Sequence, residues 1–406
     1  MKGRRNRNRG AILALMAVIG VIVAIVGLSM IQLGYHARMT AVRTVQATSA
    51  RCAADAGMAE AIYKMQKKII NEAVWNDSTL PTASKAALGG VTSTYSYAIT
   101  GSPYPGYRID STGICGPISR TTHANIVVGS YWEGVGVEEK VEVHAFAQFG
   151  VIGPYAAEGL EIRSNSTGAN QLLFFSSVTV PGDVVCGPGG NPDVVIETKQ
   201  NVVIQGQSYA ASETLTFPDV QPPDNMTFAG VMDLPNSGSL VLSSAGRYTY
   251  NGINLGQGAT LQITGDVVIY VPNPYPMILN QGAKVVIESG GSLSLYLGTR
   301  LEDKNSTGQA ADYGFVNVNG DATKLKIYGL PTCTELDLKA KSDLYAAVYA
   351  PDSRVNIFNE GNFTGAVTAR SFYMKNSGNF IFDTRLKRVN IDDPAAQFVV
   401  GRWWEN

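Results

Sequence analysis

The stretch RRNRNRGAILALMAVIGVIVAIVGLSMIQLGYHARM (residues 4–39) joins a basic leader to a long apolar run. Residues 11–33 carry no charge, and Ser29 and Gln32 are the clearly polar side chains among them. About 20 apolar residues cross the hydrocarbon core of a bilayer as a helix, whereas the apolar part of a secretory signal is about 7–15 residues long. The run therefore predicts a retained transmembrane helix and not a signal peptide that is removed.

The charges beside this run predict its orientation. Five basic residues precede it: Lys2, Arg4, Arg5, Arg7 and Arg9. Basic residues are enriched on the cytoplasmic side of membrane helices. We therefore expect a cytoplasmic leader at 1–10, a single membrane pass at 11–33 with the N-terminus inside, and the rest of the 406-residue chain outside.

The helical pattern continues beyond the membrane segment, over residues 34–75. No proline occurs there, and Ala, Met, Glu, Lys and Gln, which favour helices, are frequent. A continuous helix over residues 10–73 would be about 95 Å long. Small or apolar residues at steps of three and four predict a packing stripe for neighbouring helices, or for a domain seated on the helix. The stripe is Val42, Val45, Ser49, Cys52, Ala56, Ala59 and Tyr63.

The segment ATSARCAADAGMAEAIYKM (47–65), with the leader before it, resembles the N-terminal region of PilX-type proteins, which are type IV pilin-like. The pattern of that group is A-x-x-A-E-A-G-x-x-x-A-L. The matching residues here are Ala53, Ala54, Asp55, Ala56, Gly57 and Ala61. Pilin leaders are cut after a Gly, so the resemblance implies cleavage between Gly10 and Ala11. Leu15 stands where major pilins usually carry Glu.

The middle of the chain predicts a small antiparallel sheet. Residues 77–92 form a loop with Pro and Gly, and three alternating runs follow at 93–101, 106–116 and 119–129. Runs bounded by Gly or Pro are typical of a meander. We expect a small pilin-like β subdomain at 93–147, which residues 132–150 complete or leave.

Residues 148–388 predict a different architecture. Short runs such as DVVIYV (266–271) and AKVVIES (283–289) recur between Gly, Asn and Asp, and no helical period appears. Such a ladder favours a right-handed parallel β-helix, in which each coil stacks its inward side chains on the next. Because the repeat is irregular, with insertions at 207–237 and 301–313, a β-sandwich is the alternative. The expected fold is mainly β, with a long N-terminal transmembrane helix, a small antiparallel sheet and this solenoid.

The segment AAVYAPDSRVNIFNEGNFTGAVTARSF (346–372) resembles a β-helical domain of unknown function that bacteria fuse to PilX-type N-termini. Small residues lie where tight inward turns need them: Ala350, Gly365, Ala366 and Ala369. Residues 389–406, which contain Trp403 and Trp404, are expected to cap an open end of the solenoid.

No catalytic, cofactor or metal site is predicted, and we do not expect an enzyme. The four cysteines and three histidines lie far apart, without a CxxC pair. The adjacent pairs Glu138–Glu139 and Asp392–Asp393 would point to opposite faces of a strand, so neither is an acid/base couple. The net charge of −1, without a basic face, gives no reason to expect nucleic acid.

These observations predict a membrane-anchored, pilin-like structural protein that displays a β-helical ectodomain and acts in pilus-like assembly or adhesion. It would lie in the cytoplasmic membrane with its C-terminal part outside. Its expected partners are the membrane and other pilin-like subunits, and a surface polysaccharide is a further candidate. Two alternatives remain: a β-helical polysaccharide lyase or hydrolase, and a carbohydrate-binding module on a plain anchor. Carboxylates gathered with Arg or Lys in one groove would favour the enzyme.

Overall fold

The computed structural model describes residues 7–71, 75–89, 91–132, 134–144, 147–305, 312–358, 361–375 and 378–405. Lys2, Arg4 and Arg5 of the predicted leader lie outside the described residues. The chain divides into two compact units, which we describe separately. The first unit is Met1–Met65, Asn76–Val127 and Val400–Asn406, and the second is Gln66–Trp75 and Val128–Val399.

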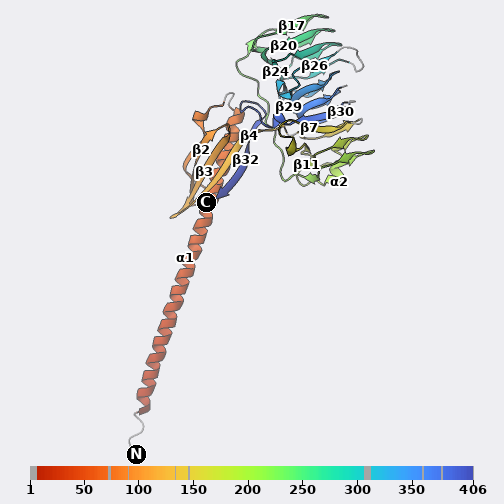
Figure 1. Ribbon diagram of the computed structural model, residues 1–406. Coiled ribbons are helices and arrows are strands. Elements are labelled where there is room, and N and C mark those ends of the chain that lie inside the picture. Colours follow the sequence, from red (N-terminus) through yellow and green to blue (C-terminus); the bar gives the residue numbers. More distant parts are fainter. Residues whose placement is uncertain are drawn as a thin grey trace, which may run out of the picture. The chain divides into compact units, whose positions relative to one another are not determined.

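One continuous helix, α1 (Arg7–Asn71), begins the described chain (Figure 1). This confirms the long helix predicted from the proline-free, Ala-rich sequence. Within it, Leu15–Ile69 contains an 18-residue window of mean hydropathy 2.5, none of which is buried. Among the described residues, this is the one helix long and apolar enough to cross a membrane.

The first unit also contains an antiparallel sheet, and the predicted meander forms the central strands of this sheet. The strand order is β1-β2-β3-β4-β32, and the pairs β1–β2, β2–β3 and β3–β4 are antiparallel. The strands are β1 (Ala83–Ala87), β2 (Thr94–Ser102), β3 (Gly106–Cys115), β4 (Ile118–Ser130) and β32 (Ala396–Glu405).

The last strand, β32, differs from the prediction. Residues 389–406 were expected to cap the solenoid, but Ala396–Glu405 lies beside β4 as the fifth strand of the small sheet. Pairing satisfies backbone groups that an open strand edge would expose. The Trp404 ring also stacks on His123 of β4, with ring centroids 5.4 Å apart. The sequence pattern did not predict that β32 pairs with β4, because the two strands lie far apart in the sequence.

Parallel strands build the second unit, and Figure 1 shows them lying one above another between β17 and β11. Their pairings form three stacks. Stack 1 comprises, in spatial order, β14 (Ser208–Ala210), β11 (Asp183–Cys186), β8 (Glu161–Ser164), β5 (Gly134–Val137), β30 (Phe363–Lys375), β29 (Leu344–Ile357), β27 (Leu325–Gly329), β24 (Ser292–Leu297), β21 (Asp266–Val271), β18 (Gly246–Thr249) and β15 (Thr227–Phe228).

Stack 2 shares the long strands β30 and β29 with stack 1. It comprises β12 (Ile196–Thr198), β9 (Leu172–Phe174), β6 (Val141–His144), β30, β29, β28 (Glu335–Leu338), β25 (Leu301–Asp303), β22 (Met277–Leu279), β19 (Ile253–Leu255) and β16 (Met232–Leu234).

Stack 3 is β17 (Ser239–Leu242), β20 (Thr260–Ile263), β23 (Lys284–Ile287) and β26 (Gly314–Asn317). The remaining elements are β7 (Phe149–Ile152), β10 (Thr179–Val180), β13 (Val203–Ile204), β31 (Phe380–Asp383), the short helix α2 (Pro192–Val195) and the 3₁₀ turns η1 (Asp77–Thr79), η2 (Ala156–Glu158), η3 (Ala322–Lys324) and η4 (Thr384–Lys387). The strand pairings described for this unit are parallel, so the alternative of an antiparallel β-sandwich is wrong.

The order of strands in stack 1 does not follow the chain. The chain begins in the middle of the stack at β5, proceeds to one end at β14, crosses to the other end at β15, and returns coil by coil to β30. Residues 211–226, part of the insertion noted at 207–237, make the crossing. We call them the strap. β30 then pairs with β5, so the last coil packs on the first.

Alternation along the strands explains the core of the second unit. In β21, Val267, Ile269 and Val271 are buried, while the residues between them are not. The small residues singled out at the end of the chain have a steric role, since Ala350, Ala366 and Ala369 are fully buried. A Cβ on Gly365 would lie 1.7 Å from the Ala346 carbonyl oxygen, so only glycine fits this coil contact.

Candidate functional site

The apolar part of α1 has no covering within the described chain. Its large side chains are exposed around the whole helix, for example Leu28 at 67% and Ile31 at 72%. The set is Leu15, Met16, Val18, Ile19, Val21, Ile22, Val23, Ile25, Val26, Leu28, Met30, Ile31 and Leu33. An apolar surface of this extent is unfavourable in water, so we expect lipid or other helices to cover it. Gly10 and Ala11 lie within the helical range of α1, and cleavage between them stays a prediction.

The second half of α1 packs one face on the antiparallel sheet. The buried residues of this face are Ala50, Ala53, Ala54, Gly57, Met58, Ala61 and Met65. Small side chains let the backbones approach closely. The Ser111 hydroxyl donates to the Ala54 carbonyl oxygen at 2.7 Å. A Cβ on Gly57 would lie 2.5 Å from Ser111 Oγ, so the glycine is sterically required.

The predicted packing stripe lies on another side of α1. Val42, Val45 and Tyr63 are 44%, 65% and 64% exposed. Cys52 and Ala59 are also exposed, and Ser49 and Ala56 are half-buried. The structure therefore separates a face that contacts the sheet from a free face of Val42, Val45, Ser49, Cys52, Ala56, Ala59 and Tyr63. The periodicity did not predict the sheet face, which contains Ala53, Ala54, Gly57 and Ala61.

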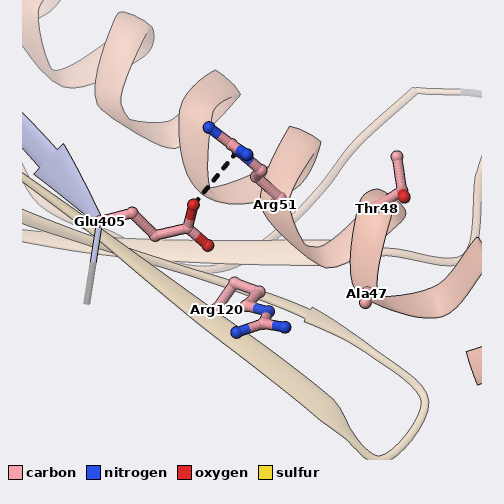
Figure 2. A pocket seen from close by; sticks show the side chains of 5 residues that line it. All are labelled: Ala47, Thr48, Arg51, Arg120 and Glu405. Carbon is pink, nitrogen blue, oxygen red and sulfur yellow. Dashed lines mark ion pairs between the residues drawn. The ribbon is translucent and has the colours of Figure 1, made fainter. Parts of the chain in front are cut away.

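A shallow cavity of about 460 Å³ lies in the first unit between α1, β4 and β32 (Figure 2). Ala47, Thr48, Arg51, Arg120 and Glu405 line it. Arg51 Nε lies 3.3 Å from Glu405 Oε2, in an exposed ion pair that stabilises little. The second arginine makes the lining net positive, but the described residues offer no buried polar group there that would hold a ligand.

The part of the chain that the structure describes contains no candidate metal site and no reactive cysteine site. No group of three or more His, Cys, Asp or Glu side chains there could hold a metal ion. Cys115, Cys186 and Cys333 are buried free thiols, and Cys52 is exposed. Burial raises the pKa of the Cys333 thiol to about 11, which makes it inert.

Two polar cavities open on stack 2 of the second unit. The first, of about 250 Å³, is lined by Glu139, Lys140, Glu142, Gln171, Arg354, Ser371, Phe372 and Tyr373. We call it the ion-pair pocket. The second, of about 430 Å³, is lined by Asp233, Leu234, Pro235, Asn236, Asn254, Gly256, Gln257, Asn280 and Gln281. We call it the amide pocket. The sequence pattern predicted neither, because their residues come from four separate segments in the ion-pair pocket and three in the amide pocket.

The ion-pair pocket contains carboxylates together with Lys and Arg, the combination that would favour an enzyme. Glu142 accepts hydrogen bonds from Lys140 Nζ at 2.7 Å, and its other oxygen lies 2.6 Å from His144 Nε2. Burial alone would raise the pKa of Glu142, but Lys140 and His144 outweigh it and lower the pKa. Glu142 therefore stays ionised near neutral pH, which does not suit a general acid.

Comparison with known proteins gives little on function. Residues 221–389 match the model of a family described as a domain of unknown function (DUF7305), less than half of the chain. No curated protein sequence matches. The competence-associated pilin ComZ from Thermus thermophilus aligns over 89% of this chain and 98% of its own, with 12% identity and a TM-score of 0.25. A TM-score this low carries no argument about fold or function.

Proposed function

We propose that the protein is a membrane-anchored, pilin-like structural protein of the PilX type. Helix α1 holds it in the cytoplasmic membrane, N-terminus inside, and packs with other pilin-like helices. The second unit, a right-handed parallel β-helix, is displayed outside the membrane. The role is assembly into a pilus-like structure, or adhesion through the displayed unit.

The observation that supports this proposal most strongly is that the two parts of α1 have different surfaces. Its first part is apolar on every side and uncovered, as a membrane helix must be. Its second part buries one small-residue face against a β sheet and leaves a second face of Val, Ala, Ser and Cys free. A plain anchor needs a membrane span and no free packing face beyond it.

The parallel pairings support the β-helix. Gly246 pairs with Val267, and Val267 pairs with Leu293 one coil further on. Three stacks with inward Val, Ile and Leu form a continuous core that no single coil could bury. The right hand of the coil follows the general preference of parallel crossover connections.

We further propose that the displayed unit is not catalytic. In the ion-pair pocket, the Glu142 carboxylate pairs with Lys140 and lies within hydrogen-bonding distance of His144. A hydrolase needs a carboxylic acid with a raised pKa beside an ionised partner. Glu142 has the opposite shift.

Disulfide cross-linking at Cys52 tests the packing of α1. Cys52 is the exposed cysteine on the free face, so oxidation of membranes with copper phenanthroline is expected to give a reducible cross-linked species. In a Cys52→Ala background, Val45→Cys should restore the product, because both positions share the face. Thr44→Cys, exposed but on another side, is the matched control. Equal yields for Val45→Cys and Thr44→Cys would contradict packing through this face.

Intact-mass measurement tests processing. A mature N-terminus at Ala11 supports the pilin-like route, and an intact leader ending in uncut Gly10 argues for a plain anchor.

A further inference from the structure

A ladder of side chains on the outer face of its strands runs along stack 2, and all of them except the buried Asn356 are at least partly exposed. In register from strand to strand it comprises Glu142, Tyr373, Asn356, Asp337, Glu302, Ile278, Asn254 and Asp233. We call it the outer ladder. Neighbouring strands lie about 4.8 Å apart, so its eight positions extend over about 34 Å. The ladder thus presents a polar group at nearly every step along the axis of the stack.

Hydrogen bonds within the ladder fix its side chains. Asn356 Nδ2 donates to Asp337 Oδ1 at 2.8 Å, and Asn254 Nδ2 donates to Asp233 Oδ1 at 2.8 Å. Asn280 Nδ2 in turn donates to Asn254 Oδ1 at 2.9 Å. Side chains ordered in advance lose little entropy when a ligand binds. Asn356 is 4% exposed and pairs with Arg354, Glu335 and Asp337, so the accessible groups of the ladder lie on either side of it.

The two polar cavities lie at opposite ends of the outer ladder. The ion-pair pocket contains Glu142 and Tyr373, and the amide pocket contains Asn254 and Asp233. Five strand steps separate Tyr373 from Asn254, about 24 Å. One ligand that engages both cavities must therefore be an extended polymer lying along the stack.

The lining of the pockets indicates a polyhydroxylated ligand. The side-chain amides of Gln257 and Gln281 are exposed and form no hydrogen bond among the described residues, and the same holds for the Glu139 carboxylate. Amides and carboxylates pair with vicinal hydroxyls. The half-buried Tyr373 ring is already packed, with Arg354 over it and His144 and Phe358 beside it, so the polar groups carry the recognition.

Charge selects among such polymers. Four of the eight ladder positions are carboxylates: Glu142, Asp337, Glu302 and Asp233. The bases nearest to them are already engaged, since Lys140 pairs with Glu142, and Arg300 and Lys304 pair with Glu302. Three bases against four carboxylates leave no net positive charge on the ladder that would attract a polyanion. An uncharged chain needs no such attraction.

We propose that the outer ladder and its two end pockets bind an uncharged polysaccharide, whose chain lies along the stack and contacts both pockets at once. This surface goes beyond the anchoring and packing role of α1 and does not depend on it. Affinity comes from repeated hydrogen bonds along one chain, and no bond in the polysaccharide is broken.

Native affinity electrophoresis of the detergent-solubilised full chain tests the proposal. Gels contain dissolved hydroxyethylcellulose, dextran or galactomannan as neutral probes, and alginate as the polyanion. At least one neutral probe is expected to retard the protein, and alginate is not. Gln257→Ala and Glu139→Ala remove one unpaired group from each pocket without breaking a described contact. Each should weaken retardation roughly fivefold, and the double variant more, as for loss of individual hydrogen bonds.

Gln262→Ala, on β20 of stack 3, is the matched control and should behave as the wild type. The proposal is overturned if no neutral probe retards the wild type, if alginate retards it most, or if both pocket variants match Gln262→Ala. A retarded protein whose Cys52 fails to cross-link keeps this binding surface and loses the pilin-like function. A protein that cross-links through Cys52 but is not retarded by any neutral probe keeps the pilin-like function and loses this binding surface.

Discussion

A Cβ atom built on Gly113 would lie 2.0 Å from the carbonyl oxygen of Ala50, so β3 and α1 touch through their backbones. Gly113→Val is therefore expected to push the sheet off the helix. Overpacking of this kind typically costs about 1–3 kcal/mol. Thermal unfolding followed by circular dichroism should register a lower Tm. Gly89→Ala, where a Cβ meets no heavy atom within 4 Å, is the control. An unchanged Tm for Gly113→Val would mean that the helix does not pack on this strand.

Burial of Asp303 predicts a pH-dependent stability. Desolvation raises its pKa to about 6, and its Oδ2 has no hydrogen-bond partner. An acid with a raised folded-state pKa binds its proton more tightly when folded, so stability falls as pH rises from about 4 through about 6. Above that window the ionised group costs about 3 kcal/mol.

Asp303→Asn should accordingly raise the Tm at pH 7.5 and lose this advantage near pH 4. Differential scanning fluorimetry across that range is the measurement. Asp312→Asn, at an exposed position nearby, serves as the comparison. A Tm gain that does not shrink on acidification would show that charge is not the cause.

The ion pair of Lys326 and Asp393 is buried in the second unit, with Nζ and Oδ2 2.5 Å apart and the Asp393 side chain 3% exposed. Tyr328 Oη also donates to Asp393 Oδ1 at 3.1 Å. Lys326→Met leaves a buried carboxylate without its cation and is expected to cost about 3 kcal/mol. Adding Asp393→Asn removes the charge and should recover part of the loss. Urea unfolding of the wild type, both single variants and the double variant measures the coupling; additive effects would contradict it.

The strap predicts a local weak point. Asn165 exchanges hydrogen bonds of 2.7 and 2.9 Å with the backbone of Leu215, Tyr349 Oη donates to the Pro218 carbonyl oxygen at 2.9 Å, and Phe217 is buried. Phe217→Ala should cost about 3 kcal/mol and speed cleavage within residues 211–226 in limited proteolysis. Phe228→Ala removes a ring that is 65% exposed and should leave the cleavage rate unchanged. Equal cleavage rates for the two variants would mean that the Phe217 side chain does not stabilise the strap and that its backbone contacts alone do.

Local patterns in the sequence predicted the local structure well. A proline-free run gave α1, alternation gave β2 to β4, and short Val and Ile runs such as 266–271 and 284–287 became β21 and β23. These features depend on residues near one another in the chain. The long helix, the antiparallel sheet and the mainly β character are confirmed.

Long-range partnerships stayed out of reach. Nothing in residues 396–405 indicates that they pair beside β4, more than 260 residues earlier in the chain. The same applies to the pairing of Val367 with Val135 and to both polar pockets, which assemble residues from several coils. Periodicity predicted a packing stripe on α1, and packing through that stripe stays a prediction. Which face meets the sheet depends on Gly113 and Ser111, which no helical pattern contains.

Because β5 pairs with β30 in the middle of stack 1, the two outer strands of the stack, β14 and β15, are joined to each other by the strap. A strand gained or lost beyond β14 or β15 would change the distance that the strap crosses and leave β5 and β30 in register. The length of the stack can therefore change in evolution one strand at a time, while the place where the chain enters and leaves the stack stays constant.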